Sequence, residues 1–250
     1  MSVPLNVSDN DTPGGLSKDL WREVIKAIED AIPLYDNIND LISFGRAQKA
    51  RMYAVQNLAL AEGARVLDGG IGPGATSKLV LSTLNSGLLV GLDGSVRQLK
   101  AARQNLAYNS NQMLEFVRGS FEFLPFRDEC FDGIVTSFAF RDSLDMSRSI
   151  SEYSRVCDGK GSFAIVDIAK PDNLLKRAGA MLYMRFIMPL IAKVAVRGRI
   201  RGNPWRMIVP TYISLPTTKV IVSMVKEKFV KVELKEFLLG GAIVIIGRKS

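Results

Sequence analysis

The chain has 250 residues, of which 47% are apolar and 23% charged, so it fits one large folded domain and is not a disordered chain. It carries a net charge of +8 and no histidine, which excludes a Ser-His-Asp triad and most transition-metal sites. Cys130 and Cys157 lie far apart with no CxxC pair, so we expect no disulfide, no zinc cluster and no other metal site.

The N-terminal quarter of the chain predicts a leader and then helices. Residues 1–15 lack a basic start and an apolar run, so we expect a flexible intracellular leader instead of a signal peptide. Apolar residues recur at helical spacing from Ser17 to Ile32, before Pro33, and Arg46 to Leu60 is a second helical segment. Residues 16–60 are therefore assigned to N-terminal helices.

Short apolar runs then alternate with helical stretches, which is typical of βαβ units and a parallel sheet. The last two runs are separated by Leu238 to Gly241 alone, too short for a crossover helix, so they should pair antiparallel. We predict an α/β, doubly wound, mostly parallel seven-stranded Rossmann-like sheet that ends in an antiparallel hairpin. The predicted strands are Ala64–Asp68, Leu88–Leu92, Leu114–Val117, Ile134–Phe138, Phe163–Ile168, Phe229–Phe237 and Ala242–Gly247.

Residues 171–215 interrupt this alternation with four prolines, and we predict a helical insertion, or lid, over the site. The core is then 61–170 with 216–250. Within the insertion, Arg185, Pro189 and Lys193 interrupt the apolar run from Ala178 to Val196, so we expect no membrane crossing.

The stretch from Asn173 to Lys226, which includes most of the insertion, is strongly basic. No acidic residue occurs between Asn173 and Lys226, and apolar residues alternate with the basic ones, which favours peripheral contact with anionic lipid. A solvated basic face and an RNA-binding surface are the alternatives. The basic residues are Lys176, Arg177, Arg185, Lys193, Arg197, Arg199, Arg201, Arg206, Lys219 and Lys226.

A glycine loop follows the first predicted strand, with Asp68, Gly70, Gly72 and Gly74 leading into the next helix. Glycines let a ligand approach the backbone closely at the carboxyl end of a parallel sheet. The spacing alone also fits a dinucleotide fingerprint. A pyrophosphate would be repelled by Asp68, whereas the ammonium and sulfonium groups of S-adenosylmethionine would be attracted to it.

Asp93, at the end of the second predicted strand, is placed to accept hydrogen bonds from the two ribose hydroxyls of either cofactor. A helix N-cap is the alternative role for Asp93. Together the glycine loop and Asp93 predict an S-adenosylmethionine-dependent methyltransferase. A nicotinamide-dependent oxidoreductase and a cofactor-binding regulatory protein without catalysis are the alternatives.

Five segments of the chain together are typical of one enzyme family: Tyr35-Asp-Asn-Ile-Asn39-Asp-Leu-Ile-Ser43-Phe-Gly45, Leu124-Pro-Phe126, Phe131-Asp132, Phe138-Ala-Phe-Arg141-Asp142 and Gly240-Gly241. From about residue 33 to the C-terminus, and in the same order, they resemble the ubiquinone/menaquinone biosynthesis C-methyltransferase family. That family usually has Arg-Asn where this chain has Arg141-Asp142, and Asp or Asn where it has Ser120.

The resemblance implies methyl transfer from S-adenosylmethionine to a ring carbon of a prenylated quinol, with further cofactor contacts at Gly94, Ser120, Phe121 and Ser137. Methylation of another small molecule or of RNA remains open, although the segment around Phe138 lacks the Asn/Asp-Pro-Pro-aromatic pattern of amine methyltransferases, so nucleic acid is not favoured. We expect a lipid-soluble small-molecule substrate, a homodimer, and a cytoplasmic, membrane-associated location.

The resemblance places the catalytic residues at Arg141, Asp142 and Tyr35. Arg141 would stabilise a phenolate and Asp142 would act as the base. A salt bridge for Arg141, a helix cap for Asp142, and packing or turn roles for Tyr35 and Asn39 are the alternatives.

Overall fold

The computed structural model describes residues 14–106, 111–196 and 203–249. Within them, seven strands form one sheet in the order β3-β2-β1-β4-β5-β7-β6, with β7 antiparallel to both of its neighbours and all other pairs parallel. The strands are β1 (Arg65–Gly69), β2 (Gly87–Asp93), β3 (Gln112–Arg118), β4 (Phe131–Ser137), β5 (Cys157–Ile168), β6 (Val230–Phe237) and β7 (Ala242–Arg248).

Helices cover both faces of this sheet and one of its ends. The α-helices are α1 (Lys18–Ala31), α2 (Tyr35–Ile42), α3 (Arg46–Asn57), α4 (Ala75–Thr83), α5 (Val96–Asn105), α6 (Met146–Val156), α7 (Leu174–Leu182), α8 (Met188–Val196), α9 (Ile208–Ser214) and α10 (Thr218–Lys226). Shorter turns are η1 (Ile32–Leu34), η2 (Phe140–Asp142), η3 (Tyr183–Ile187, π-helical), η4 (Pro204–Met207) and η5 (Leu238–Gly240).

Two apolar clusters hold these layers together. Alanines and valines of α3 and α4 pack with β1 residues such as Val66 on one face of the sheet. On the other face, Tyr153 of α6 and Ile221 of α10 pack with Leu67 and Phe163, because alternate residues of a strand point to opposite faces. The central strands β1, β4, β5 and β7 are therefore buried on both faces, while the edge strands β3 and β6 stay more exposed.

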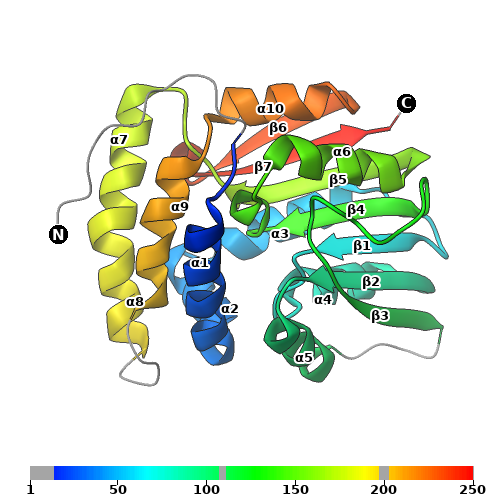
Figure 1. Cartoon of the computed structure of the whole chain (residues 1–250), viewed down its shortest axis with the longest axis horizontal. Helices are drawn as coiled ribbons and strands as arrows, with labels where there is room; N and C mark the ends of the chain where they lie inside the picture. Colours follow the sequence, from blue (N-terminus) through cyan, green and yellow to red (C-terminus); the bar gives the residue numbers. More distant parts are fainter. Residues whose placement is uncertain (1–13, 107–110, 197–202, 250) are drawn as a thin grey trace.

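The remaining helices gather beyond the carboxyl ends of the parallel strands. Figure 1 shows α1, α2, α7, α8 and α9 side by side at that end of the sheet. The register aligns Gly69 of β1 with both Leu92 of β2 and Thr136 of β4. The residues that follow these strands therefore meet under the helical cap.

The predicted sheet, its antiparallel hairpin and the helical insertion before the last two strands are confirmed, with strand bounds that differ by a few residues. The largest difference is β5, which begins at Cys157 instead of Phe163. The predicted helix from Arg46 ends at Asn57, and Tyr35–Ile42 forms a helix of its own. Nearly all of the predicted leader, and Arg197, Arg199 and Arg201, lie outside the described residues.

Candidate active site

The glycine loop after β1 forms one wall of a cavity of about 430 Å³. Gly70 has a positive φ of 78°, and a Cβ added to it would clash with the Cβ of Ala139 at 2.3 Å, so only glycine fits there, whereas a Cβ at Gly72 would meet nothing within 4 Å. Gly72 also lines the cavity, while Gly74 turns the chain into α4 behind it. The loop thus leaves its backbone open to a ligand.

Asp93 ends β2 at the wall of the same cavity. The N–H of Gly72 donates to its Oδ2 (3.0 Å) and the N–H of Ser95 donates to its Oδ1 (2.9 Å). Burial raises the pKa of Asp93, and these two hydrogen bonds oppose the rise. The N-cap of α5 is Ser95, so the alternative of a helix cap for Asp93 is wrong.

Asp68 lies behind the glycine loop and is only 1% exposed. The Ser77 hydroxyl donates to its Oδ2 (2.6 Å), whereas its Oδ1 is buried without a hydrogen-bond partner among the described residues. Burial raises the pKa of Asp68 to about 6, against the Ser77 hydrogen bond and the charge of Arg51. Asp68 was predicted to contact the cofactor, but it does not line the cavity, and its unpartnered oxygen lies behind the glycine loop.

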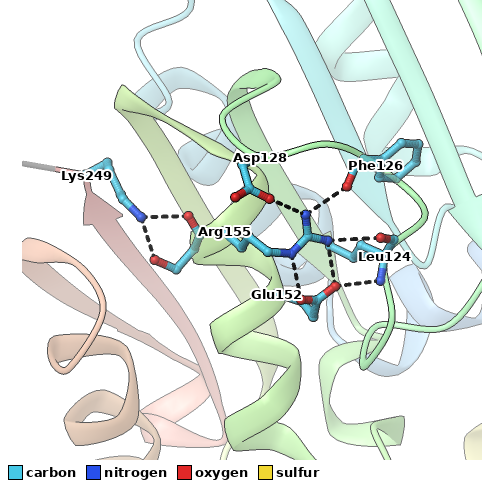
Figure 2. Close-up of polar contacts among 7 residues, drawn as sticks. Leu124, Phe126, Asp128, Glu152, Arg155 and Lys249 are labelled. Atoms are coloured by element: carbon cyan, nitrogen blue, oxygen red, sulfur yellow. Dashed lines mark hydrogen bonds and ion pairs between the residues drawn. The ribbon is translucent and has the colours of Figure 1, made fainter.

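The loop after β3 supplies the opposite wall, with Ser120 and Phe121, and Gly94 and Ser137 complete the predicted set. Arg155 of α6 fixes the continuation of that loop, as Figure 2 shows. Its guanidinium donates to the carbonyls of Leu124 (3.0 Å) and Phe126 (2.8 Å) while Glu152 holds it from the other side. Arg155 therefore holds the Leu124-Pro-Phe126 segment in place.

Sequence reasoning missed four charged residues that line this cavity, Asp36, Arg51, Arg118 and Glu122, and the first two come from helices. Arg51 is 4% exposed on the alanine-rich face of α3; its Nε donates to the Ser137 hydroxyl (3.2 Å), and its guanidinium lies 4.9 Å from the Phe138 ring centroid. Asp36 has a buried Oδ1 without a partner among the described residues, and burial raises its pKa. An arginine on an otherwise alanine-rich helix face is the sequence signal for Arg51.

A second, larger cavity of about 740 Å³ lies under the helical cap. Its walls come from α1, α2, α7, α9 and the turns beside them, and its lining is mostly apolar. The Trp205 indole N–H donates to Asn39 Oδ1 (2.9 Å), and the Tyr183 hydroxyl donates to the Ile42 carbonyl, so both bonds tie α2 to the insertion. Asn39 therefore joins two segments that line the cavity and lie far apart in the sequence.

The two cavities share four lining residues, namely Ile28, Tyr35, Phe138 and Asp142. Tyr35 and Asp142 were predicted from the family resemblance, and both lie at this junction. Burial raises the pKa of Tyr35, and the Arg141 charge opposes the rise. A ligand in one cavity therefore meets a ligand in the other next to a phenol and a carboxyl group.

Arg141 lines the larger cavity and is tied to a carboxylate that sequence reasoning missed. Its Nη1 donates to Asp167 Oδ1 (2.8 Å). Like Asp68 and Asp93, Asp167 lies near the carboxyl end of a parallel strand. Burial alone would lower the pKa of Arg141, but Asp142 and Asp167 raise it, so the guanidinium stays charged. The alternative of a salt bridge is thus present in the structure.

Asp142 lies in η2, and its Oδ1 is 3.7 Å from Arg141 Nε, too far for a hydrogen bond. Burial raises the pKa of Asp142 to about 6; Arg141 opposes this, while Asp167 and Asp93 add to it. The N-cap of α6 is Asp145, so the alternative of a cap for Asp142 is wrong. Asp142 is a buried carboxyl poised to exchange a proton near neutral pH.

Solved structures share this fold. A chain from the complex of the Haloferax volcanii Trm112 methyltransferase activator with a methyltransferase aligns with a TM-score of 0.63 at 15% identity, covering 94% of this chain and 99% of that one. An S-adenosylmethionine-dependent methyltransferase from Thermotoga maritima gives 0.59 at 16% identity, covering 92% and 100%. The fold, with its glycine loop at the strand ends, is that of the S-adenosylmethionine-dependent methyltransferases.

The chain belongs to the ubiE/COQ5 methyltransferase family, whose model matches residues 17–249. The demethylmenaquinone methyltransferase of Desulfitobacterium hafniense is 28% identical over 86% of this chain and 85% of the relative. That of Bacillus cereus is 27% identical over 91% and 94%. The chain is therefore a methyltransferase enzyme, and the alternatives of an oxidoreductase and of a non-catalytic regulator are set aside.

Proposed function

We propose that the protein transfers a methyl group from S-adenosylmethionine to a ring carbon of a prenylated quinol of the menaquinone or ubiquinone type. The observation that carries the proposal is the junction at which the two cavities meet, bordered by Tyr35, Phe138 and Asp142. Methyl transfer to carbon requires a donor and an acceptor side by side, aligned and shielded from water. Two adjoining cavities of different polarity suit that requirement.

The residues of the smaller cavity fit the donor. At Gly72 an added Cβ would meet nothing within 4 Å, so a ligand can approach the backbone there, and the Asp93 carboxylate suits a ribose. The buried Asp68 carboxylate behind the loop would attract a cationic group through its charge. Each Asp93 oxygen accepts one backbone hydrogen bond and can accept another. When bound, S-adenosylmethionine supplies a methyl group already activated by its sulfonium. Gly72, Gly94, Ser120, Phe121 and Ser137 would surround it.

The larger cavity fits the acceptor. Its 740 Å³ lies within the roughly 300–1,000 Å³ of small-molecule sites, and its apolar helical walls suit a ring with an isoprenoid tail. The names of the relatives favour demethylmenaquinol as the acceptor.

The polar groups at the junction can activate a phenolic ring. Asp142, with a pKa of about 6, is ionised at neutral pH and can take the phenolic proton, which raises electron density on the ring carbons. The charged Arg141, held by Asp167, favours the phenolate that results. Tyr35 would orient the ring from α2. A homodimer, a cytoplasmic location and contact with a membrane stay predictions.

The test is a methylation assay with radiolabelled S-adenosylmethionine and separate lipid, RNA and protein fractions. We expect label in the lipid fraction, and with reduced demethylmenaquinone a product heavier by one CH2 unit. Replacing the quinol by the oxidised quinone should abolish the product, because a quinone has no phenolic proton to lose. Label in RNA, or in polar small molecules alone, would contradict the quinol assignment and leave the methyltransferase class intact.

A further inference from the structure

Leu174–Val196 is a continuous helical stretch of 23 residues that is long and apolar enough, by length and composition alone, to cross a membrane. Only one of its faces is buried. Met184, Met188, Ala192 and Val196 recur every four residues and pack against the body of the protein. Because this face is anchored, the stretch lies along the molecule (Figure 1), and its other face needs a different explanation.

The outward face carries a row of large apolar side chains, which we call the outer ridge: Leu175, Leu182, Phe186, Leu190 and Val194. Seven-residue and four-residue spacings keep them on one side of the helix. They are between 58% and 84% exposed. A soluble helix normally places polar residues on this side, and a contiguous apolar row of this kind marks an interaction site.

The outer ridge is continuous with the mouth of the larger cavity. Leu175 belongs to both, and two other lining residues, Phe44 and Leu239, are 67% and 89% exposed. Phe44 and Leu239 have positive φ angles of 52° and 56°, an uncommon conformation for bulky residues that is found at functional sites. The cavity therefore opens through an apolar rim at one end of the ridge.

The charges beside the ridge indicate what covers it. Arg185 and Lys193 are exposed along the same stretch, whereas Lys176 forms an exposed ion pair with Glu236 (3.0 Å). No acidic residue occurs between Asn173 and Lys226. A second copy of the chain bound through this face would place these charges against each other, because a twofold interface repeats the same patch. Anionic phospholipid headgroups instead complement the basic side chains, and acyl chains accept the ridge.

We propose that the outer ridge lies in the interfacial layer of an anionic bilayer, with Leu175, Leu239 and Phe44 opening the larger cavity directly toward the acyl chains. The ridge then acts as a membrane-binding surface, and the rim as a lateral entrance through which a lipid-soluble ring reaches the site without crossing water. The membrane-binding part stands on the helix alone, and the entrance rests on the proposed function.

The test uses the full-length chain and flotation with vesicles of phosphatidylglycerol and phosphatidylcholine in equal parts, against phosphatidylcholine alone. We expect binding to the anionic vesicles that weakens with added salt. The variant Leu182→Ser, Phe186→Ser, Leu190→Ser should lower the partition coefficient by about tenfold or more, since each lost side chain removes apolar area from the bilayer. None of the three lines the cavity.

The matched control is Met113→Ser, which removes an equally exposed side chain (61%) from the edge strand β3 and should bind vesicles as the wild type does. Equal vesicle binding by the wild type and the triple variant, or no binding by either, would overturn the proposal. So would a wild-type dimer that the triple variant converts to a monomer while neither binds vesicles, because a second copy would then cover the ridge.

Methylation rates with a water-soluble and a membrane-embedded quinol distinguish the lateral entrance from the proposed enzymatic function. The triple variant should methylate a short-chain, water-soluble quinol at the wild-type rate and lose about tenfold with a long-chain quinol embedded in vesicles. Equal rates of the variant and the wild type on the embedded quinol would overturn the lateral entrance. Absence of methyl transfer to either acceptor would instead refute the proposed function, while the flotation result still decides the membrane surface.

Discussion

The two cavities are built in different ways. The smaller one takes most of its polar groups from strand ends and from the loops directly after them, with Asp36 and Arg51 added from helices. Backbone N–H groups of Gly72 and Ser95 hold Asp93. The larger one is enclosed by helices from segments far apart in the chain, as the bond between Asn39 and Trp205 illustrates. The first is a rigid polar site, and the second is an apolar space whose shape depends on packing.

Asp142 lines both cavities, and a substitution at this junction should have the largest effect on activity. Asp142→Asn removes the base, so we expect kcat to fall by about 100-fold or more with little change in the KM for S-adenosylmethionine. The wild-type kcat/KM should fall as the pH drops below about 6, because Asp142 must be unprotonated, and the variant should lack that dependence. Steady-state kinetics from pH 5 to 8 measures both.

The family that this chain resembles usually has asparagine at this position. Asp142→Asn therefore tests whether methyl transfer by this chain requires the Asp142 carboxylate. Asp145→Asn is the control, because asparagine still caps α6 and kcat should stay within about twofold. Wild-type kcat and an unchanged pH profile in Asp142→Asn would reduce Asp142 to a residue that merely borders the site.

The floor of the larger cavity depends on a buried ion pair. Asp167→Asn removes the carboxylate that accepts the Arg141 hydrogen bond and leaves Asp142, 3.7 Å away, as the remaining buried counter-charge, so we expect the free energy of unfolding to fall by about 3 kcal/mol. Asp132→Asn is the control, because its ion pair with Arg65 is about one third exposed and should matter by less than about 1 kcal/mol. Denaturant titration compares them, and equal losses would contradict the distinction.

Behind the glycine loop of the smaller cavity lies a carboxyl group, Asp68, whose ionised form lowers the stability of the fold. The folded protein holds the Asp68 proton more tightly than the unfolded chain does, so ionising this group destabilises the fold progressively between pH 3.8 and about 6, and fully above that. Asp68→Asn should therefore raise the free energy of unfolding at pH 8 by up to about 3 kcal/mol and weaken S-adenosylmethionine binding. Its stability gain should vanish below pH 4, and a loss of stability at pH 8 would contradict the account.

Two glycine substitutions, one beside each cavity, should have the smallest effects on binding and stability. Gly70→Ala places a Cβ against Ala139 at a positive φ, so S-adenosylmethionine affinity should fall by about tenfold. Gly179→Ala lies in α7 at the wall of the larger cavity, where a Cβ meets nothing within 4 Å, and should stabilise the helix by about 0.5–1 kcal/mol. Calorimetry with S-adenosylmethionine should find weakened binding in the first variant alone.

The same contrast explains what the sequence could predict. Strand ends and glycine turns are local features, so the glycine loop and Asp93 could be placed from neighbouring residues, and Asp167 was open to the same reasoning. Arg51 meets Ser137 across 86 positions, and Asn39 meets Trp205 across 166, and no local pattern encodes such contacts. The apolar cavity and its rim follow from the packing of distant helices, so they needed the folded chain.

The most direct test of the account is a crystal structure with S-adenosylhomocysteine bound. We predict the ribose hydroxyls within hydrogen-bond distance of Asp93 and the thioether sulfur facing Phe138 and Asp142, toward the larger cavity. A nucleoside bound anywhere else, or a sulfur that faces away from the larger cavity, would contradict the claim that donor and acceptor meet at this junction.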